Sequence, residues 1–345
     1  MHGDSMKTQQ DPRMLKVETG HLEKAYQYFP TDEFIDYRVY ERVPKWWRWI
    51  EELLRLDLYL ALRAKRIAAR YDIIWANSEK VAVPLSFLNI RKPMVVILQN
   101  PESPLRMLLI RLTGIARKWA GIGIVSKDAR QLLQSEFGVR PERIFQYYAA
   151  RTDLFGPANR EDHTKERPIL SIGVAKRDYD TMIAALSELP GYQTEIFVSS
   201  KYGDRYTGGR IRKAPNWIRF PGRLTDEELR QRYQQARFVV VPLRATSHSG
   251  AGVTSVFEAS ASGKAVIATD TGGMNSYVVD GKTGLLVPPS DVQALRSAIR
   301  KLWENPGLAH EMGTAGREFV EKNYSQQGVV ELTTAFLKNL TAVSS

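Results

Sequence analysis

The sequence predicts an α/β protein with two domains, each a doubly wound parallel sheet covered by helices. Three observations support this prediction. Short apolar segments alternate with helical patterns along the chain, which is typical of βα units. Several of these segments are almost continuously apolar, as strands buried on both faces of a sheet are. Finally, 345 residues exceed what one such core usually holds, and a polar stretch with Gly and Pro, residues 155–167, divides the chain.

The first half carries six predicted strands. They are short apolar runs at residues 14–18, 34–40, 72–76, 93–98, 122–125 and 143–147. Helical patterns lie between the first two strands, up to about Tyr28, and between the last two, over residues 127–137. Gly20 and His21 follow the first strand, and a glycine at that place in a doubly wound domain often lets the backbone approach a ligand.

The segment from Lys45 to Tyr71 is the most conspicuous part of the first half. Pro44 precedes it, and its periodicity predicts one continuous helix. One interpretation is an amphipathic helix on an anionic bilayer, because tryptophans and leucines are interspersed with arginines. The other is a helix packed on both sides inside the domain, because its apolar stripe is broader than one contact needs. We favour the packed helix.

The second half continues the alternation of strands and helices. Strands are predicted at residues 168–173, 194–199, 217–220, 238–242 and 265–268. Helices are predicted at residues 179–189, 225–235, 292–304, 307–323 and 329–340, and a shorter one carries Glu258. Thr225 has the side chain and position of an N-cap for the second of these helices.

The composition limits the kinds of partner. The net charge is +11, and residues 1–160 hold 26 Lys and Arg against 18 Asp and Glu. A basic first half suggests an anionic partner, such as a phosphorylated acceptor or an acidic membrane, although a merely soluble basic surface would look the same. No nucleic-acid-binding motif accompanies the charge, so nucleic acid is not an expected partner.

The absence of cysteine excludes disulfides and thiolate-bound metal. No signal-peptide pattern opens the sequence, and no apolar run is long enough to span a membrane.

Residues 247–286 carry the clearest sign of a ligand site. Small residues, Ser249-Gly250-Ala251-Gly252, precede the helix that holds Glu258. Such residues at a helix N-terminus let backbone N–H groups approach a phosphate, and the helix dipole favours its negative charge. Glu258 lies about one turn beyond Thr254, within reach of a sugar hydroxyl next to that phosphate. The spacing therefore predicts an anion site between a strand and a helix.

The same segment resembles the retaining nucleotide-sugar glycosyltransferases of family 4, which have the GT-B fold. The resemblance rests on Phe257-Glu258-Ala259, Gly263-Lys264-Ala265-Val266-Ile267-Ala268-Thr269-Asp270, Gly272-Gly273, Asp280-Gly281 and Thr283-Gly284-Leu285-Leu286-Val287-Pro288-Pro289. It implies two Rossmann-like, doubly wound parallel-sheet domains facing across a cleft. We expect an acceptor-side domain at residues 1–160, a nucleotide-sugar domain at 161–324, and a C-terminal helix, about 325–345, that returns to the first domain.

The resemblance also assigns roles to the predicted diphosphate and nucleobase loops. Gly173 and the cations Lys176 and Arg177 occupy a shortened form of the family's diphosphate loop. Lysine would act there as a point charge and arginine as a bidentate fork. A second loop, Gly222-Arg223-Leu224, takes the place where the family's backbone faces the nucleobase.

The third loop contains the predicted ribose and diphosphate contacts. Glu258 matches the family's ribose-binding acid, the second of a pair spaced E-x7-E. The backbone amides of Gly252, Val253 and Thr254 would hold the diphosphate, and the hydroxyl of Thr254 could add a contact.

Two departures from the family pattern affect the sugar side of the site. The first acid of the pair is replaced by Gly250, and a histidine common in the family is replaced by Gln99. Glutamine can hydrogen-bond a sugar but cannot ionise. His248 is the candidate to replace a lost polar contact, although a single histidine on a loop is often just solvated. His21, in the first loop, is a further candidate on the sugar or acceptor side.

These observations predict a glycosyltransferase of the hexosyltransferase type. It would move a sugar from a UDP- or GDP-linked donor to a carbohydrate or lipid-linked acceptor, with retention, without a metal or other cofactor, and in envelope polysaccharide or glycolipid synthesis. We expect it in the cytoplasm, with possible peripheral contact at the inner membrane face through residues 45–71. Two alternatives stay open: a non-catalytic GT-B subunit that binds nucleotide or a partner, and a GT-B enzyme of other chemistry, such as an inverting transferase or a sugar-nucleotide epimerase.

Overall fold

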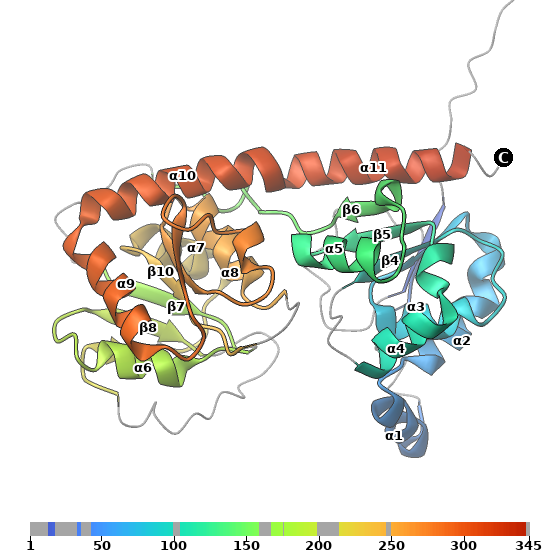
Figure 1. Ribbon diagram of the computed structural model, residues 1–345, viewed down its shortest axis with the longest axis horizontal. Coiled ribbons are helices and arrows are strands. Elements are labelled where there is room, and N and C mark those ends of the chain that lie inside the picture. The colour runs from blue at the N-terminus through green and yellow to red at the C-terminus, as the bar shows by residue number, and fades with distance from the viewer. Residues whose placement is uncertain are drawn as a thin grey trace, which may run out of the picture. The chain divides into compact units, whose positions relative to one another are not determined.

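The chain forms two compact units in a computed structural model (Figure 1). The structure describes residues 13–17, 33–35, 43–98, 104–158, 167–174, 176–198, 214–245 and 250–342. The first unit comprises residues 1–124, 132–147 and 330–345, and the second comprises residues 125–131 and 148–329. Among the described residues, no helix is both long and apolar enough to cross a membrane.

The first unit contains a six-stranded sheet in which every neighbouring pair of strands is parallel. The strand order is β2-β1-β3-β4-β5-β6. The bounds are β1 Met14–Val17, β2 Glu33–Ile35, β3 Ile73–Ala76, β4 Met94–Leu98, β5 Gly121–Ile124 and β6 Ile144–Gln146. β1, β3 and β5 are fully buried, which explains why their sequences are almost continuously apolar.

Helices surround this sheet. They are α2 Leu58–Ile67, α3 Glu79–Ser86 and α4 Pro104–Thr113. α5, Lys127–Ser135, contributes its residues from Leu132 onward, and the C-terminal α11, Gln326–Ala342, contributes its residues from Val330 onward. On α11, the ring of Phe336 packs against Phe145 of β6 with centroids 4.9 Å apart. A Cβ added to Gly121 would lie 2.4 Å from the Phe336 ring, so this strand position has no room for a side chain.

The predicted continuous helix over residues 45–71 is wrong, because the structure breaks it into two. α1 spans Lys45–Leu54 and α2 begins at Leu58. Arg55 adopts a left-handed conformation, with φ 53° and ψ 39°. The Leu56 N–H donates to the Glu51 carbonyl at 3.1 Å and the Arg55 N–H donates to the Glu52 carbonyl at 3.3 Å, which is the Schellman pattern of a helix end. Glycine normally marks this position, so an arginine there hides the break from sequence analysis.

The two helices also differ in what covers their apolar residues. α2 buries Leu60, Ala61 and Ala64, as the packed interpretation predicts. On α1, by contrast, Trp46, Trp49 and Leu53 are 61%, 63% and 64% exposed. The packed interpretation is therefore wrong for α1, whose apolar stripe faces away from the core.

The second unit contains another six-stranded parallel sheet, in the order β12-β11-β10-β7-β8-β9. Its strands are β7 Ile169–Ile172, β8 Thr194–Phe197, β9 Ile218–Arg219, β10 Val239–Val241, β11 Val266–Thr269 and β12 Gly284–Val287. Its helices are α6 Tyr179–Leu186, α7 Asp226–Gln235, α8 Val253–Ala261, α9 Val292–Glu304 and α10 Pro306–Tyr324.

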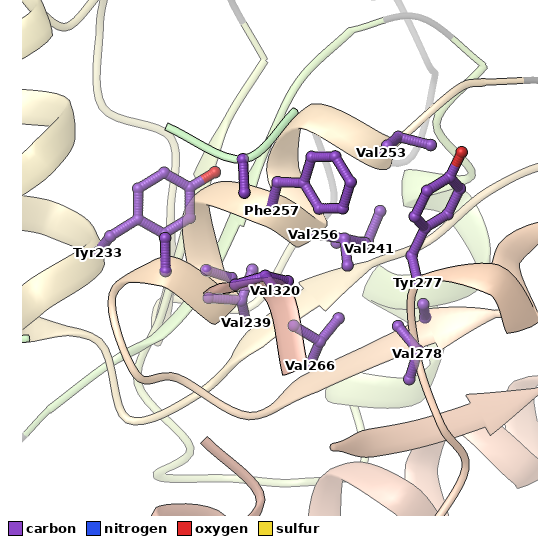
Figure 2. Packing of buried hydrophobic residues seen from close by; sticks show 14 of the residues in the cluster. Tyr233, Val239, Val241, Val253, Val256, Phe257, Val266, Tyr277, Val278 and Val320 are labelled. Atoms are coloured by element: carbon purple, nitrogen blue, oxygen red, sulfur yellow. The ribbon is translucent and has the colours of Figure 1, made fainter. Parts of the chain in front are cut away.

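Two hydrophobic clusters lie on opposite faces of this sheet. Val239 and Val241 of β10 belong to one cluster, with side chains of α7, α8 and α10, while Val240 belongs to the other, with α6 and α9. Successive residues of a strand point to opposite faces, so this alternation buries both sides. Figure 2 shows the first cluster, in which Phe257 of α8 meets Tyr277 edge-on with ring centroids 5.2 Å apart. This packing fixes α8, the helix that carries Glu258.

The predicted linker, residues 155–167, begins inside this cluster. Phe155 is buried and lies edge-on to Tyr233 with centroids 5.7 Å apart. Residues 159–166 lie outside the described part of the chain. The domain boundaries at residues 160 and 324 stay predictions from the sequence.

Candidate donor-binding site

The candidate site lies where β7 and β10 of the second unit end. Open α/β sheets bind ligands at the carboxyl ends of their strands. Two backbone hydrogen bonds join the loops that follow these strands: the Asp178 N–H donates to the Pro242 carbonyl and the Arg244 N–H donates to the Lys176 carbonyl, each at 3.0 Å. The loop after β10 then leads to α8, so the predicted diphosphate loop and the helix with Glu258 come from neighbouring strands.

Arg177 connects the diphosphate loop to α8 from inside the unit. The residue is 4% exposed, and its Nη2 donates to the Ile172 carbonyl at 2.9 Å and to the Ser255 hydroxyl at 2.8 Å. Burial lowers the pKa of the guanidinium, while Tyr179, Tyr233 and Glu258 oppose that shift. Gly173 makes room for it: its φ is +123°, and a Cβ there would lie 2.5 Å from Nη2 of Arg177.

Lys176 differs from its neighbour. It is partly exposed and holds a left-handed conformation with φ 55°. One cation of the pair is thus partly exposed to solvent while the other is buried. The structure therefore distinguishes two residues that the sequence presents as an equivalent basic pair.

The N-terminus of α8 has the features of an anion site. Gly252 precedes the helix with φ +84°, and a Cβ there would lie 2.9 Å from Cγ1 of Val241. Gly252 has no side chain to cap the helix at the positive end of its dipole, and the Val253 N–H donates to the Gly250 carbonyl at a long 3.4 Å. Thr254, in the first turn, is exposed. The predicted grouping of Gly252, Val253 and Thr254 at a helix start is what the structure has.

Glu258 is held by a side chain that sequence analysis missed. The hydroxyl of Tyr233 on α7 donates to Oε2 of Glu258 at 2.8 Å. Desolvation raises the pKa of Glu258 to about 7, while the Tyr233 hydrogen bond and the charges of Arg151 and Arg177 oppose the rise. A tyrosine on the inward face of a helix is usually taken as core packing, and 25 residues separate it from Glu258, so only the tertiary structure reveals the pair.

The remaining predicted residues have different outcomes. Thr225 is the predicted N-cap of α7, and its Oγ1 accepts from the Glu228 N–H at 3.2 Å in a capping box. Gly222 and Arg223, just before it, are exposed, whereas Leu224 packs against the core cluster. Their role at the nucleobase stays a prediction. His21, Gln99 and His248 lie outside the described residues.

Gly250 occupies the place of the missing family acid without a steric need for glycine. A Cβ there would lie 3.4 Å from Cε2 of Tyr148 and 3.5 Å from Cγ2 of Val125, which are ordinary contacts. The backbone at this position is not in the left-handed region. Within the described ranges, no group of three or more His, Asp or Glu side chains could hold a metal ion.

Comparison with known proteins relates this chain to glycosyltransferases. A family model for glycosyl transferases group 1 matches residues 209–319, which include α8 and Glu258. Over 297 residues the chain is 28% identical to the GDP-mannose-dependent alpha-(1-6)-phosphatidylinositol monomannoside mannosyltransferase of Mycolicibacterium smegmatis, covering 77% of this chain and 76% of that enzyme. A glycosyltransferase structure from Rickettsia africae matches with a TM-score of 0.69 at 16% identity, covering 95% of this chain and 98% of the other. These similarities show a glycosyltransferase whose residues 209–319 match the group 1 family.

The predicted fold and activity of this glycosyltransferase are thereby confirmed. It has two parallel-sheet α/β domains of the GT-B type, and it is a nucleotide-sugar glycosyltransferase similar to those of family 4. Anabaena Alr3699/HepE, solved in complex with UDP-glucose, has the same fold, with a TM-score of 0.68 at 17% identity. The match covers 95% of this chain and 100% of the other. Relatives thus include proteins named for GDP-mannose and a structure holding UDP-glucose.

Proposed function

We propose that the second unit of this glycosyltransferase binds the nucleotide diphosphate sugar and the first unit binds the acceptor. The observation that carries the proposal is the pairing of Glu258 with Tyr233 on a helix whose N-terminus has no side-chain cap. The carboxylate of Glu258 accepts hydrogen bonds from the ribose hydroxyls. The amides of Val253 and Thr254 hold the diphosphate at the start of the same helix.

Charge stabilisation of the leaving group is the main chemical task. During transfer, the bond between the anomeric carbon and the diphosphate oxygen breaks, and a bond to the acceptor hydroxyl oxygen forms on the same face. The acceptor proton passes to the departing phosphate oxygen. The ammonium of Lys176 and the α8 amides stabilise the developing negative charge, which is why we propose retention without a metal ion. Arg177 acts as a positioning residue, because its guanidinium fastens the loop to Ser255.

A thermal-shift panel tests the donor site. UDP, GDP, ADP and their common sugars are each added to the wild type and to Glu258→Gln, since a ligand that binds only the folded state raises the melting temperature. We expect one nucleotide to stabilise the wild type and to lose most of this effect in the variant. The same panel is run on Lys176→Ala. Its control is Lys301→Ala, which changes an exposed lysine on α9 and should keep full binding.

Product analysis tests the chemistry. Transfer to an acceptor, or to water, is followed by NMR of the anomeric proton. Retention of the donor configuration supports the same-face route, and inversion contradicts it. Full activity of the double variant Lys176→Ala/Arg177→Ala would contradict the assignment of these cations to the site.

We further propose that the first unit touches an anionic bilayer at the cytoplasmic face of the membrane. Trp46, Trp49 and Leu53 form an exposed stripe on α1 at positions i, i+3 and i+7, the spacing of one helix face. α4 has a second exposed stripe with the same spacing, Leu105, Leu108 and Leu112. Arginines accompany both stripes, Arg48 on α1 and Arg111 on α4, and cations beside apolar side chains favour anionic lipid. A relative named for a phosphatidylinositol mannoside acceptor agrees with this placement.

Vesicle sedimentation tests the membrane contact. We expect binding to phosphatidylglycerol-containing vesicles and little to pure phosphatidylcholine. The double variant Trp46→Ser/Trp49→Ser should bind about tenfold more weakly, because the apolar contact is lost. Leu332→Ser is the control, since Leu332 is exposed on α11 outside both stripes. Equal weakening by both variants, or none by either, would contradict the proposal.

A further inference from the structure

The first unit contains a pocket that the donor chemistry does not use. Its volume is about 530 Å³, within the range of small-molecule sites. All the residues that line it are ionisable: the cations Arg48, Arg55, Lys80 and Arg106, and the acids Glu51, Glu52 and Asp57. They come from α1, from the turn between α1 and α2, and from the beginnings of α3 and α4. Because α3 follows β3 and α4 follows β4, the pocket lies toward the carboxyl ends of these strands, where open α/β sheets bind ligands.

One wall of the pocket is formed by Arg106, whose positive charge is compensated by an ion pair. Arg106 is 3% exposed, and its Nη2 contacts Oε1 of Glu79, which is fully buried, at 3.1 Å. Its Nη1 donates to the Arg55 carbonyl at 2.9 Å. One guanidinium thus ties α4 to α3 and to the turn that ends α1. This wall of the pocket is therefore built on buried side chains.

Glu51 supplies the feature that points to a ligand. It is 5% exposed, and its Oε1 accepts the Tyr59 N–H at 2.6 Å. Its Oε2 is buried and has no hydrogen-bond partner among the residues that the structure describes. A buried carboxylate oxygen without a partner is destabilising, so this position calls for a donor such as a ligand hydroxyl.

Cations at the mouth of the pocket favour an anionic group, whereas Glu51 favours a hydrogen-bond donor. Arg48 and Arg55 are exposed and Lys80 is partly exposed. These three cations outnumber the two acids, the exposed Glu52 and the partly exposed Asp57, and favour an anionic group. A ligand that satisfies both ends needs a phosphate and a neighbouring hydroxyl.

We propose that this pocket binds a phosphorylated polyol. The phosphate contacts Arg48, Arg55 and Lys80, and one hydroxyl donates to Oε2 of Glu51. A soluble sugar phosphate and a glycerol- or sugar-phosphate lipid headgroup share this chemistry. The role of the ligand as acceptor rests on the proposed function, whereas the binding itself does not.

Calorimetric titration of the full-length protein tests the inference. The probes are sn-glycerol 3-phosphate, glycerol and inorganic phosphate. We expect glycerol 3-phosphate to bind at least tenfold more tightly than either of the others, since only it meets both requirements. Glu51→Gln keeps an oxygen for the Tyr59 N–H but removes the carboxylate. It should abolish the advantage of glycerol 3-phosphate over phosphate, and the control Glu142→Gln, which changes an exposed acid of the first unit that does not line the pocket, should keep it.

Several outcomes would overturn the inference. They are no binding of glycerol 3-phosphate, equal binding of the three probes, or wild-type affinity in Glu51→Gln. Arg48→Gln provides a second test that does not depend on a buried residue, and it should weaken glycerol 3-phosphate and phosphate alike. Competition by phosphatidylglycerol vesicles assigns the site to a lipid headgroup, and its absence assigns it to a soluble ligand.

The donor panel separates this inference from the proposed function. If Glu51→Gln keeps the nucleotide-induced thermal shift while losing glycerol 3-phosphate, the two sites are independent and both proposals stand. If glycerol 3-phosphate binds but no nucleotide shifts the wild type, the donor assignment fails and the pocket remains.

Discussion

Each unit of this glycosyltransferase buries an arginine near the start of a helix, but the two arginines have different partners. Arg106 of the first unit forms an ion pair with the buried Glu79. Arg177 of the second unit donates to a backbone carbonyl and to the Ser255 hydroxyl, which are neutral. The charge of Arg106 is thus compensated inside the fold, whereas that of Arg177 adds to the field around Glu258. We therefore place the charge of Arg177 in the donor site, whereas Arg106 forms a charge-compensated wall of the pocket in the first unit.

The largest effect on stability is expected from Arg106→Ala. The change leaves the fully buried carboxylate of Glu79 without the charge of Arg106, and breaking such a pair costs about 3–5 kcal/mol. Arg177→Ala exposes only neutral groups and should cost about 1–3 kcal/mol. Chemical denaturation of both variants measures the difference. Equal losses would show that the two arginines play the same structural part.

Glu258 should make stability depend on pH. Its pKa in the folded protein is raised to about 7 from an ordinary value of 4.5, mainly by desolvation. Between these values the folded protein keeps a proton that the unfolded chain has released. The stability contribution is therefore full below the lower value and is lost as pH rises toward 7, by at most about 3 kcal/mol. Denaturation from pH 5 to 8 should show this fall in the wild type relative to Glu258→Gln, and parallel curves for the two proteins would contradict it.

The same proton should weaken donor binding at low pH. The ionised carboxylate accepts hydrogen bonds from ribose, and its protonated form accepts fewer. Sugar nucleotides are the right probes, because their diphosphate is esterified at both ends and does not titrate near neutrality. Affinity is expected to fall below pH 7, by up to tenfold per pH unit. Tyr233→Phe removes a hydrogen bond that favours the ionised form and should move the midpoint to higher pH. An unchanged midpoint would mean that Tyr233 only packs.

Two glycines that precede α8 should respond differently to alanine. Gly252→Ala places a side chain at φ +84° and within 2.9 Å of Val241, which should cost about 1–3 kcal/mol. Gly250→Ala makes only ordinary contacts with Tyr148 and Val125 and should stay within about 0.5 kcal/mol of the wild type. Thermal denaturation of the pair is a matched comparison, and similar losses would place both glycines under the same constraint.

The sequence predicted the strands, helices and caps that depend on local residue patterns. Buried strands such as β4 and β11 are continuous apolar runs, α9 was located residue for residue, and Thr225 was identified as a cap. These features depend on local preferences that each segment carries itself. The break after α1 was missed because it rests on an arginine in a left-handed conformation, where glycine is the usual signal.

The candidate site was predictable only in part. Glu258 and the glycines of α8 follow a local pattern, so they could be proposed from sequence. The roles of Tyr233 and Arg177 depend on hydrogen bonds to α8 that cross 25 and 78 residues of chain. The exposed stripe on α1 was misjudged for a related reason: an amphipathic pattern shows that a helix has an apolar face, but not what covers it.

The smallest effect is expected from restoring the missing family acid. Gly250→Glu finds ordinary contacts at Cβ, so stability should change by no more than about 0.5 kcal/mol. If Glu258, Lys176 and the α8 amides hold the nucleotide, affinity for UDP or GDP alone should change less than twofold. Any larger change should appear only with the sugar nucleotide, because the family acid serves the sugar side. Gly250→Gln controls for size without charge. A strong loss of UDP or GDP affinity in Gly250→Glu alone would mean that a carboxylate at residue 250 repels the diphosphate, and the sugar would then have to lie elsewhere than the family pattern implies.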